Sequence, residues 1–365
     1  MRDQDHGLRT RFGTTWSVGH FDGEIAFATL RRHFEQAAAT RPGGVHRFSG
    51  TFGGETVLMR IVGDELAEHI CRPFSHLRTG GSTGAPRLTI DLWDDSGTWS
   101  DGAAAERRPW TETTVTSADG RFLGQRLPYT VSCLDRDAGH IVAAIEWHDR
   151  MYIYERAKPL ARPLLEWHND RGIQVIHTGL VARDGKGVLL AGKSGSGKST
   201  SSLACARAGF DYLSEDYAGL QNHEDGSFTG HSLYNSVFLE TSHLARFPEL
   251  MPYAITGRLP EEEKSVIILS QVFPERLARS VSIRALALLR VTDTPALDVR
   301  PAPKGEALLA LGVSSLLQLP NRSLGSRGLD ILARLVERVP CYRLEVGSDF
   351  AAIAHRVESL LAEVP

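Results

Sequence analysis

Hydrophobic positions in the first part of the chain alternate between two spacings. A repeat of three to four residues, typical of a helix that buries one face, occurs over residues 25–39 and again over 64–71. Period-two alternation, typical of half-buried strands, predicts strands at 54–62, 87–93, 113–117, 129–134 and 140–147. The first twenty or so residues are polar, and the stretch 94–109 is rich in Asp, Ser, Gly and Ala, which predicts a surface loop. This part of the chain is expected to form an α+β unit.

The remainder of the sequence alternates strands and helices throughout, which is typical of an α/β domain. The predicted strands lie at 173–181, 188–191, 210–216, 265–269, 282–291 and 341–346, and 231–240 is either a strand or a strand that enters a helix. The predicted helices lie at 199–208, 304–319, 325–339 and 350–364. A tight turn at 183–187 predicts that a hairpin leads into the strand 188–191. A charged segment with two prolines, 150–163, predicts the domain boundary, so that domains of 1–152 and 153–365 are expected.

Composition agrees with two domains and narrows the class of protein. A chain of 365 residues, 42% of them hydrophobic, is long for a single core. Lys and Arg number 41 against 44 Asp and Glu, so the formal charge of −3 provides no overall field that would attract nucleic acid or an anionic membrane. No signal-peptide pattern or long apolar run occurs, and we expect a cytoplasmic protein. The four cysteines include no Cys-x-x-Cys pair, which argues against a zinc knuckle or a thioredoxin-like site.

The most informative motif is a P-loop at the end of the strand 188–191. There an apolar run enters Gly-Lys-Ser-Gly-Ser-Gly-Lys-Ser, which matches Gly-x-x-x-x-Gly-Lys-Ser, and a predicted helix follows. Glycines allow the backbone N–H groups to face one anion, Lys198 can reach the terminal phosphates, and the Ser199 hydroxyl can bind Mg²⁺. The predicted nucleotide-binding residues are Gly192, Ser194, Gly195, Ser196, Gly197, Lys198, Ser199 and Thr200. ATP and Mg²⁺ are therefore the expected cofactors.

Charged side chains near the P-loop are the candidates for catalysis. Glu215 and Asp216 end the strand that follows the P-loop helix, where one carboxylate can hold Mg²⁺ and the other can accept a hydroxyl proton. Which of the two is the base stays open, and Ser199 and Asp216 are the predicted metal ligands. Lys264 stands before an apolar strand and either contacts phosphate or acceptor or belongs to a solvated turn. Two weaker candidates of the same kind are Arg258 and Arg322.

These residues together resemble a known family. The run 176–199, IHTGLVARDGKGVLLAGKSGSGKS, resembles the catalytic core of the HPr kinase/phosphorylase family, in which a histidine precedes the P-loop by the interval seen for His177. The resemblance continues from 207–209 to Glu215 and Asp216, where the family has two aspartates. It implies a fold similar to phosphoenolpyruvate carboxykinase, a carboxylate base for an acceptor serine, and His177 near the transferred phosphate. A looser resemblance covers residues 155–365.

Two departures from the family pattern affect the expected substrate. Glu215 stands where the family usually has Asp, and the Gly-Arg-Gly stretch with which the family engages HPr is missing. The resemblance therefore implies a related serine kinase with a different peptide or protein acceptor, and relatives of this kind phosphorylate lasso-peptide precursors. A nucleotide-gated binding module and a small-molecule kinase are the alternatives, and a homo-oligomer stays open.

Overall fold

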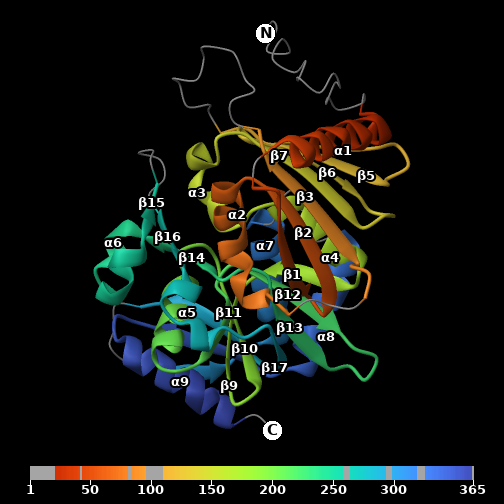
Figure 1. Ribbon diagram of the computed structural model, residues 1–365. Coiled ribbons are helices and arrows are strands. Elements are labelled where there is room, and N and C mark those ends of the chain that lie inside the picture. The colour runs from red at the N-terminus through yellow and green to blue at the C-terminus, as the bar shows by residue number, and fades with distance from the viewer. Residues whose placement is uncertain are drawn as a thin grey trace, which may run out of the picture. The chain divides into compact units, whose positions relative to one another are not determined.

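The computed structural model describes residues 21–41, 43–80, 84–95, 110–257, 264–292, 298–318 and 325–363 (Figure 1). It is a mixed α/β structure, as the alternation of hydrophobic spacings predicts. Contacts divide the chain into two compact units. Unit 1 comprises residues 1–72 and 78–167, and unit 2 comprises residues 73–77 and 168–365. No helix in the described ranges is long and apolar enough to cross a membrane.

Unit 1 is built on a seven-stranded sheet in the order β1-β2-β3-β7-β6-β5-β4. Its strands are β1 Val45–Phe52, β2 Glu55–Val62, β3 Leu88–Asp94, β4 Thr113–Thr116, β5 Phe122–Arg126, β6 Thr130–Asp135 and β7 His140–Ile145. The pairs β2–β3 and β3–β7 are parallel, and the other neighbours are antiparallel. All five strands predicted for this part are confirmed. The pattern missed two strands, β1 and β5. β1 lies at the edge of the sheet, and its first three residues are not buried, so its apolar signal is short.

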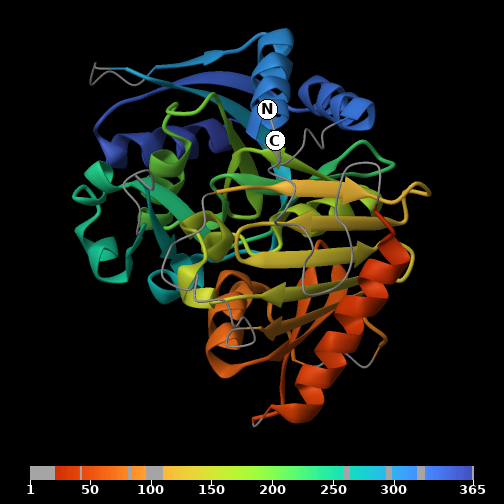
Figure 2. The same cartoon turned by 90° about the horizontal axis from the view of Figure 1, so that it is seen from above.

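Helix α1, Gly23–Thr40, crosses β3, β7, β6 and β5 and covers one face of this sheet (Figures 1 and 2). The Asp22 carboxylate accepts a hydrogen bond from the Ile25 N–H at 3.0 Å and caps the first turn. Ala26, Leu30 and Phe34 form the apolar stripe that packs into the core beneath. The remaining helices are α2 Asp64–Cys71, α3 Ile153–Ala157 and α4 Ala161–Asp170, which begins in unit 1 and ends beyond its last residue. The helices predicted at 25–39 and 64–71 are confirmed.

A buried carboxylate lies in the middle of the parallel strands of unit 1. Asp91 on β3 is fully buried and accepts two hydrogen bonds of 2.6 Å from Arg60 on β2. His140 on β7 contacts the same carboxylate at 2.8 Å. Burial alone would raise the pKa of Asp91, but the hydrogen bonds from His140 and Arg60 outweigh it and lower the pKa below its ordinary value. The three strands are thus joined by a charged network as well as by backbone hydrogen bonds.

Unit 2 is built on a nine-stranded sheet with the path β11-β9-β10-β17-β13-β12-β8, and β19 pairs with both β17 and β18. The strands are β8 Ile173–His177, β9 Gly179–Arg183, β10 Lys186–Ala191, β11 Asp211–Ser214, β12 Tyr217–Asn222, β13 Phe228–Ser232, β17 Ser280–Val291, β18 Val299–Pro301 and β19 Cys341–Val346. Parallel pairing of β10 with β17 and of β17 with β19 forms its centre. The predicted hairpin into the P-loop strand is confirmed as β9–β10, whereas the predicted strand 173–181 is divided at Thr178 into β8 and β9.

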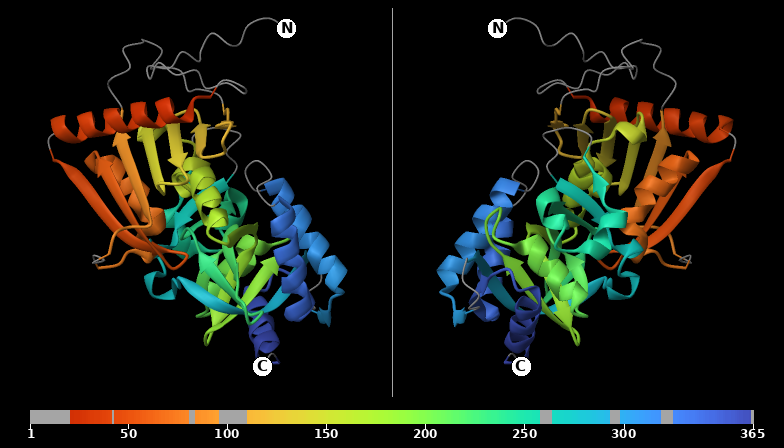
Figure 3. Two further views of the ribbon diagram at one scale, coloured as in Figure 1. Left: turned by 90° about the vertical axis from the view of Figure 1, so that its right-hand side faces the viewer. Right: turned by 90° about the vertical axis from the view of Figure 1, so that its left-hand side faces the viewer.

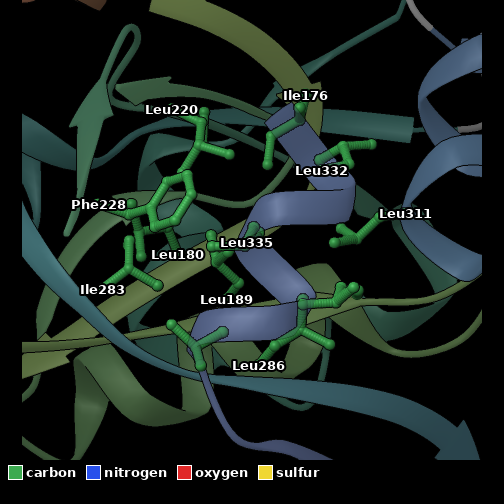
Figure 4. Packing of buried hydrophobic residues seen from close by; sticks show 14 of the residues in the cluster. Ile176, Leu180, Leu189, Leu220, Phe228, Ile283, Leu286, Leu311, Leu332 and Leu335 are labelled. Carbon is green, nitrogen blue, oxygen red and sulfur yellow. The ribbon is translucent and has the colours of Figure 1, made fainter. Parts of the chain in front are cut away.

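Helices cover the two faces of the central strands of unit 2. They are α5 Lys198–Arg207, α7 Lys304–Gln318, α8 Gly325–Arg338 and α9 Phe350–Ala362. On one face α7 and α8 lie side by side (Figure 3), and Leu332 and Leu335 of α8 pack against Leu189 of β10 and Leu286 of β17 (Figure 4). On the other face α5 and α9 contact each other, and α9 buries Val357 and Leu360. The P-loop strand is therefore buried on both faces, which explains its uninterrupted apolar sequence.

A smaller sheet of three strands completes unit 2, in the order β14-β16-β15. Its strands are β14 Ser236–Glu240, β16 Lys264–Ile268 and β15 Ile255–Thr256, and the one-turn helix α6 Thr241–Leu244 follows β14. The segment 231–240, predicted as a strand or a strand that enters a helix, contains the end of β13 and the whole of β14, and Asn235 lies in the short connection between them. The N–H of the fully buried Asn235 donates to the Pro73 carbonyl at 2.9 Å, and its Nδ2 donates to Ser75 Oγ at 2.9 Å. These bonds hold the segment 73–77 in unit 2.

The boundary between the units differs in position from the one expected at 152/153. Contacts place residues up to Trp167 in unit 1. Glu155 on α3 accepts a hydrogen bond from Thr130 Oγ1 at 2.9 Å, and Glu166 on α4 accepts one from Arg136 at 2.9 Å. The charged stretch that marks the boundary in the sequence is thus bonded to the sheet of unit 1.

Candidate active site

The P-loop sequence forms the connection between β10 and α5. The strand ends at Ala191, the helix begins at Lys198, and the residues between them are the glycine-rich turn. A Cβ at Gly192 would lie 2.4 Å from Ser196 Oγ, so the turn closes on this residue as only glycine permits. Gly195 has a φ of 77° and open space where a Cβ would stand. The backbone at this position is therefore accessible for a ligand to approach closely.

Two further features of the turn suit an anion. Helix α5 has Gly197 as its N-cap, and no side chain caps its first turn, so its N–H groups are left for another acceptor. The Ser196 side chain is buried, and its Oγ has no hydrogen-bond partner among the described residues. An oxyanion at this helix end would satisfy both groups. The residues present thus fit a phosphate.

Lys198 is held inside its own loop. Its Nζ donates to the Gly192 carbonyl at 2.9 Å and to the Lys193 carbonyl at 3.2 Å, and the residue is 7% exposed. Burial lowers the pKa of Lys198 from 10.5 to about 8, Glu215 opposes this shift, and the charge of Lys264 adds to it. The ammonium of Lys198 is therefore held at the loop mainly by carbonyl groups, and Glu215 is the negative charge that favours its protonated form.

Ser199 and Glu215 are in direct contact. The Ser199 hydroxyl lies 2.5 Å from Glu215 Oε2, and the other carboxylate oxygen, Oε1, accepts the Phe238 N–H of β14 at 3.1 Å. Glu215 is 4% exposed. Both of its oxygens are thus fixed, one towards the P-loop helix and one towards the smaller sheet of unit 2. Of the two adjacent carboxylates, Glu215 and not Asp216 is the one that meets Ser199.

Asp216 forms a pair with His177 instead. His177 Nε2 lies 2.7 Å from Asp216 Oδ1. The pair follows from the sheet, because His177 ends β8 opposite Tyr217 at the start of β12, and the Thr178 N–H donates to the Asp216 carbonyl at 2.8 Å. The His177 side chain is 7% exposed and that of Asp216 is 21% exposed. The carboxylate is thus the more accessible member of the pair.

Ser314 and Ser315 of α7 also reach this pair, and the sequence pattern did not indicate them. Ser314 Oγ lies 2.5 Å from His177 Nδ1 and donates to the Gly192 carbonyl at 3.2 Å. Ser315 Oγ accepts the His177 backbone N–H at 3.1 Å. Both serines are buried. Two consecutive serines inside the apolar stretch 307–317 of this helix are the signal that the sequence contains for them.

The other predicted site residues take less central positions. Lys264 begins β16 opposite Glu240 of β14, and its charge acts on Lys198. Ser194 is exposed in the turn, and Thr200 is half-buried in the first turn of α5. Arg258 and Arg322 lie outside the described residues.

The carboxylates fit a metal ion only together with a phosphate ligand. In the described part of the chain no group of three or more His, Cys, Asp or Glu side chains could hold a metal by itself. Mg²⁺ is usually bound through one or two carboxylates, water and substrate phosphates. The Ser199 hydroxyl and Glu215, which stand at the anion-accepting end of α5, suit that kind of binding.

Similarity to known proteins is remote. No family model matches the chain, and no curated protein matches it. Among solved structures, the Hpr(Ser) kinase/phosphatase from Coxiella burnetii is similar at 14% sequence identity with a TM-score of 0.28, over 52% of this chain and 94% of that one.

Proposed function

We propose that this protein is an ATP- and Mg²⁺-dependent phosphotransferase that acts on a hydroxyl group. The observation that carries the proposal is that the two adjacent carboxylates are separated into two contacts, Glu215 with the P-loop Ser199 and Asp216 with His177. Phosphoryl transfer from ATP needs one group that binds the metal and another that receives the proton of the attacking hydroxyl. A site that only binds nucleotide needs no second acid.

Nucleotide binding is assigned to the turn and the first residues of α5. The N–H groups of the uncapped helix end and of Gly195 would donate to phosphate oxygens, and the Ser196 hydroxyl would be a further donor. Lys198 would turn from the Gly192 and Lys193 carbonyls towards the terminal phosphates, whose negative charge would offset that of its ammonium. The remaining residues of the motif, Gly192, Ser194, Gly197 and Thr200, shape the turn and the helix start.

Mg²⁺ is assigned to Ser199 and Glu215. Asp216, the residue after Glu215, is left for another role. When bound, the ion neutralises negative charge on the phosphate oxygens and orients them for transfer. The contact between the Ser199 hydroxyl and Glu215 holds both groups at the start of α5. The Phe238 N–H fixes the far oxygen of the carboxylate and so keeps Glu215 from turning away.

The base is assigned to Asp216, with His177 as its partner. Asp216 is more exposed than Glu215, so an acceptor hydroxyl can reach its carboxylate. A proton taken from that hydroxyl would pass to the Asp216 carboxylate, and His177 Nε2 lies within hydrogen-bond distance of its Oδ1. Lys264, at the start of β16, supplies a positive charge near Lys198 and the phosphates.

A serine of a peptide or protein is the proposed acceptor, and a lasso-peptide precursor is the proposed example. This part rests on the sequence resemblance of residues 176–199 and on the missing Gly-Arg-Gly stretch. Transfer of labelled γ-phosphate to a library of serine peptides tests it, with Lys198→Ala and Asp216→Asn as inactive controls. Full activity of both variants would refute the mechanism. Nucleotide binding without transfer to any acceptor would favour a nucleotide-gated binding module, and competition by hydroxylated metabolites would favour a small-molecule kinase.

A further inference from the structure

The geometry points to Ser314 as a positioning residue that fixes the His177 ring and couples it to the P-loop. This inference rests on the proposed function for its catalytic consequence. Ser314 Oγ lies 2.5 Å from His177 Nδ1 and 3.2 Å from the Gly192 carbonyl oxygen. Its side chain thus contacts both His177 and the first residue of the turn. Helix α7 thereby joins two parts of the site that are remote from it in the sequence.

The hydroxyl of Ser314 has one hydrogen and two acceptors within reach. If Nδ1 accepts it, the imidazole of His177 carries its own hydrogen on Nε2 and donates to Asp216. If the Gly192 carbonyl accepts it, His177 Nδ1 loses that donor, while Nε2 keeps its hydrogen and its contact with Asp216. The two arrangements have the same protons and differ only in the direction of the Ser314 O–H bond. Rotation of this one bond thus changes the hydrogen bonding of Nδ1 and with it the hold on the His177 ring.

The Gly192 carbonyl links the direction of the Ser314 O–H bond to the position of Lys198. Lys198 Nζ and Ser314 Oγ both donate to the same carbonyl oxygen, at 2.9 and 3.2 Å. When the Lys198 ammonium leaves the loop, the Gly192 carbonyl oxygen loses one of these donors. Among the described residues, the side-chain donor that then stays in contact with it is Ser314. Among the described residues, charged groups near His177 include Asp216, Lys198 across the carbonyl, and Glu215 next to Asp216 in the chain. Release of Lys198 therefore favours the arrangement in which the Ser314 hydroxyl donates to the Gly192 carbonyl and not to His177 Nδ1.

Ser314→Ala, Ser314→Thr and the neighbouring Ser315→Ala test the inference in the full chain. Imidazole ¹⁵N resonances of His177, assigned with His177→Gln, are recorded at one pH without nucleotide and with a non-hydrolysable ATP analogue. In the unmodified protein and in Ser314→Thr, we expect the Nδ1 resonance to show a hydrogen bond and to move when the analogue binds. In Ser314→Ala both effects are expected to vanish. Ser315→Ala, which removes only the acceptor of the His177 backbone N–H, is expected to keep them.

Kinetics give the second measurement. Ser314→Ala is expected to lower kcat by about tenfold with KM for ATP unchanged, and Ser314→Thr to restore most of it. An Nδ1 resonance that is the same in Ser314→Ala and the unmodified protein would overturn the inference, as would an equal fall in stability and kcat in Ser314→Ala and Ser315→Ala. If no acceptor is ever phosphorylated, the proposed function fails while the resonances still decide whether Ser314 couples the loop to His177.

Discussion

His177 and Asp216 lie 2.7 Å apart, Nε2 to Oδ1, although β9, β10, the P-loop and α5 come between them in the chain. The pairing of β8 with β12 brings them together, because His177 stands opposite Tyr217 in the register. A strand register changes only with the whole sheet, so this distance is set by the core of unit 2 rather than by the local sequence. Predictions that separate the roles of the surrounding residues follow from this arrangement.

Glu215→Gln and Asp216→Asn are expected to have different effects. Loss of the Glu215 charge beside Ser199 should raise the Mg²⁺ concentration for half-maximal activity by about tenfold or more. Loss of the Asp216 charge should lower the maximal rate by roughly 10²- to 10⁴-fold and leave the Mg²⁺ dependence unchanged. Steady-state rates across a Mg²⁺ titration measure both. The same Mg²⁺ shift in the two variants would show that the carboxylates are not separated by task.

Lys198→Met is expected to abolish phosphotransfer but to stabilise the fold. The pKa of Lys198 is lowered from 10.5 to about 8 by burial, so the folded state loses its proton first as pH rises. Between pH 8 and pH 10.5, about the two pKa values, the unfolded state binds more protons than the folded state. The free energy of unfolding of the unmodified protein therefore rises with pH in this range. The variant should be more stable at pH 7 by roughly 1–3 kcal/mol and lack this rise. Urea unfolding at pH 7, 8 and 9 measures the free energy of unfolding of both proteins. The same dependence of this free energy on pH in Lys198→Met and in the unmodified protein would contradict the prediction.

Gly192→Ala is expected to disturb the turn. Its Cβ would stand 2.4 Å from Ser196 Oγ and 3.2 Å from the Leu289 carbonyl oxygen, so the loop has to shift. We expect a loss of roughly 1–3 kcal/mol in stability and at least a tenfold weaker binding of ATP. Gly305→Ala in the first turn of α7, where a Cβ meets nothing within 4 Å, is the matched control and should be neutral or slightly stabilising. Calorimetric titration with ATP measures the affinities, and unchanged binding by Gly192→Ala would refute the role of the turn.

Asp91→Ala is expected to destabilise unit 1 by about 3–5 kcal/mol, because it leaves the Arg60 guanidinium without its buried partner. Arg60→Met combined with Asp91→Leu removes both charges and should cost much less. Denaturant unfolding followed by tryptophan fluorescence compares the two, since Trp93 lies in the same strand β3. A double variant as unstable as Asp91→Ala would show that the pair is not what the single change disrupts.

The sequence alone determined the features that depend on neighbours in the chain. The glycine-rich turn between β10 and α5, the hairpin β9–β10 and the helices α1, α2 and α8 follow from residue types at fixed short spacings, and the structure has these elements where the pattern predicts them. Lys198 approaches its own loop for the same reason, since its Nζ reaches the carbonyls of Gly192 and Lys193. Hydrophobic spacing reports which face of an element is buried, and that is a local property.

The tertiary structure decided which residues act together. Glu215 and Asp216 are adjacent in the chain, yet the Phe238 N–H and Ser199 hold one, and His177 holds the other. Ser314 joins the site only because α7 packs against β8 and β10. Such contacts depend on the direction of side chains from elements far apart in the sequence, and no spacing encodes them. The physical reason is that hydrophobic burial fixes the packing of helices on the sheet, and the packing then chooses the polar partners.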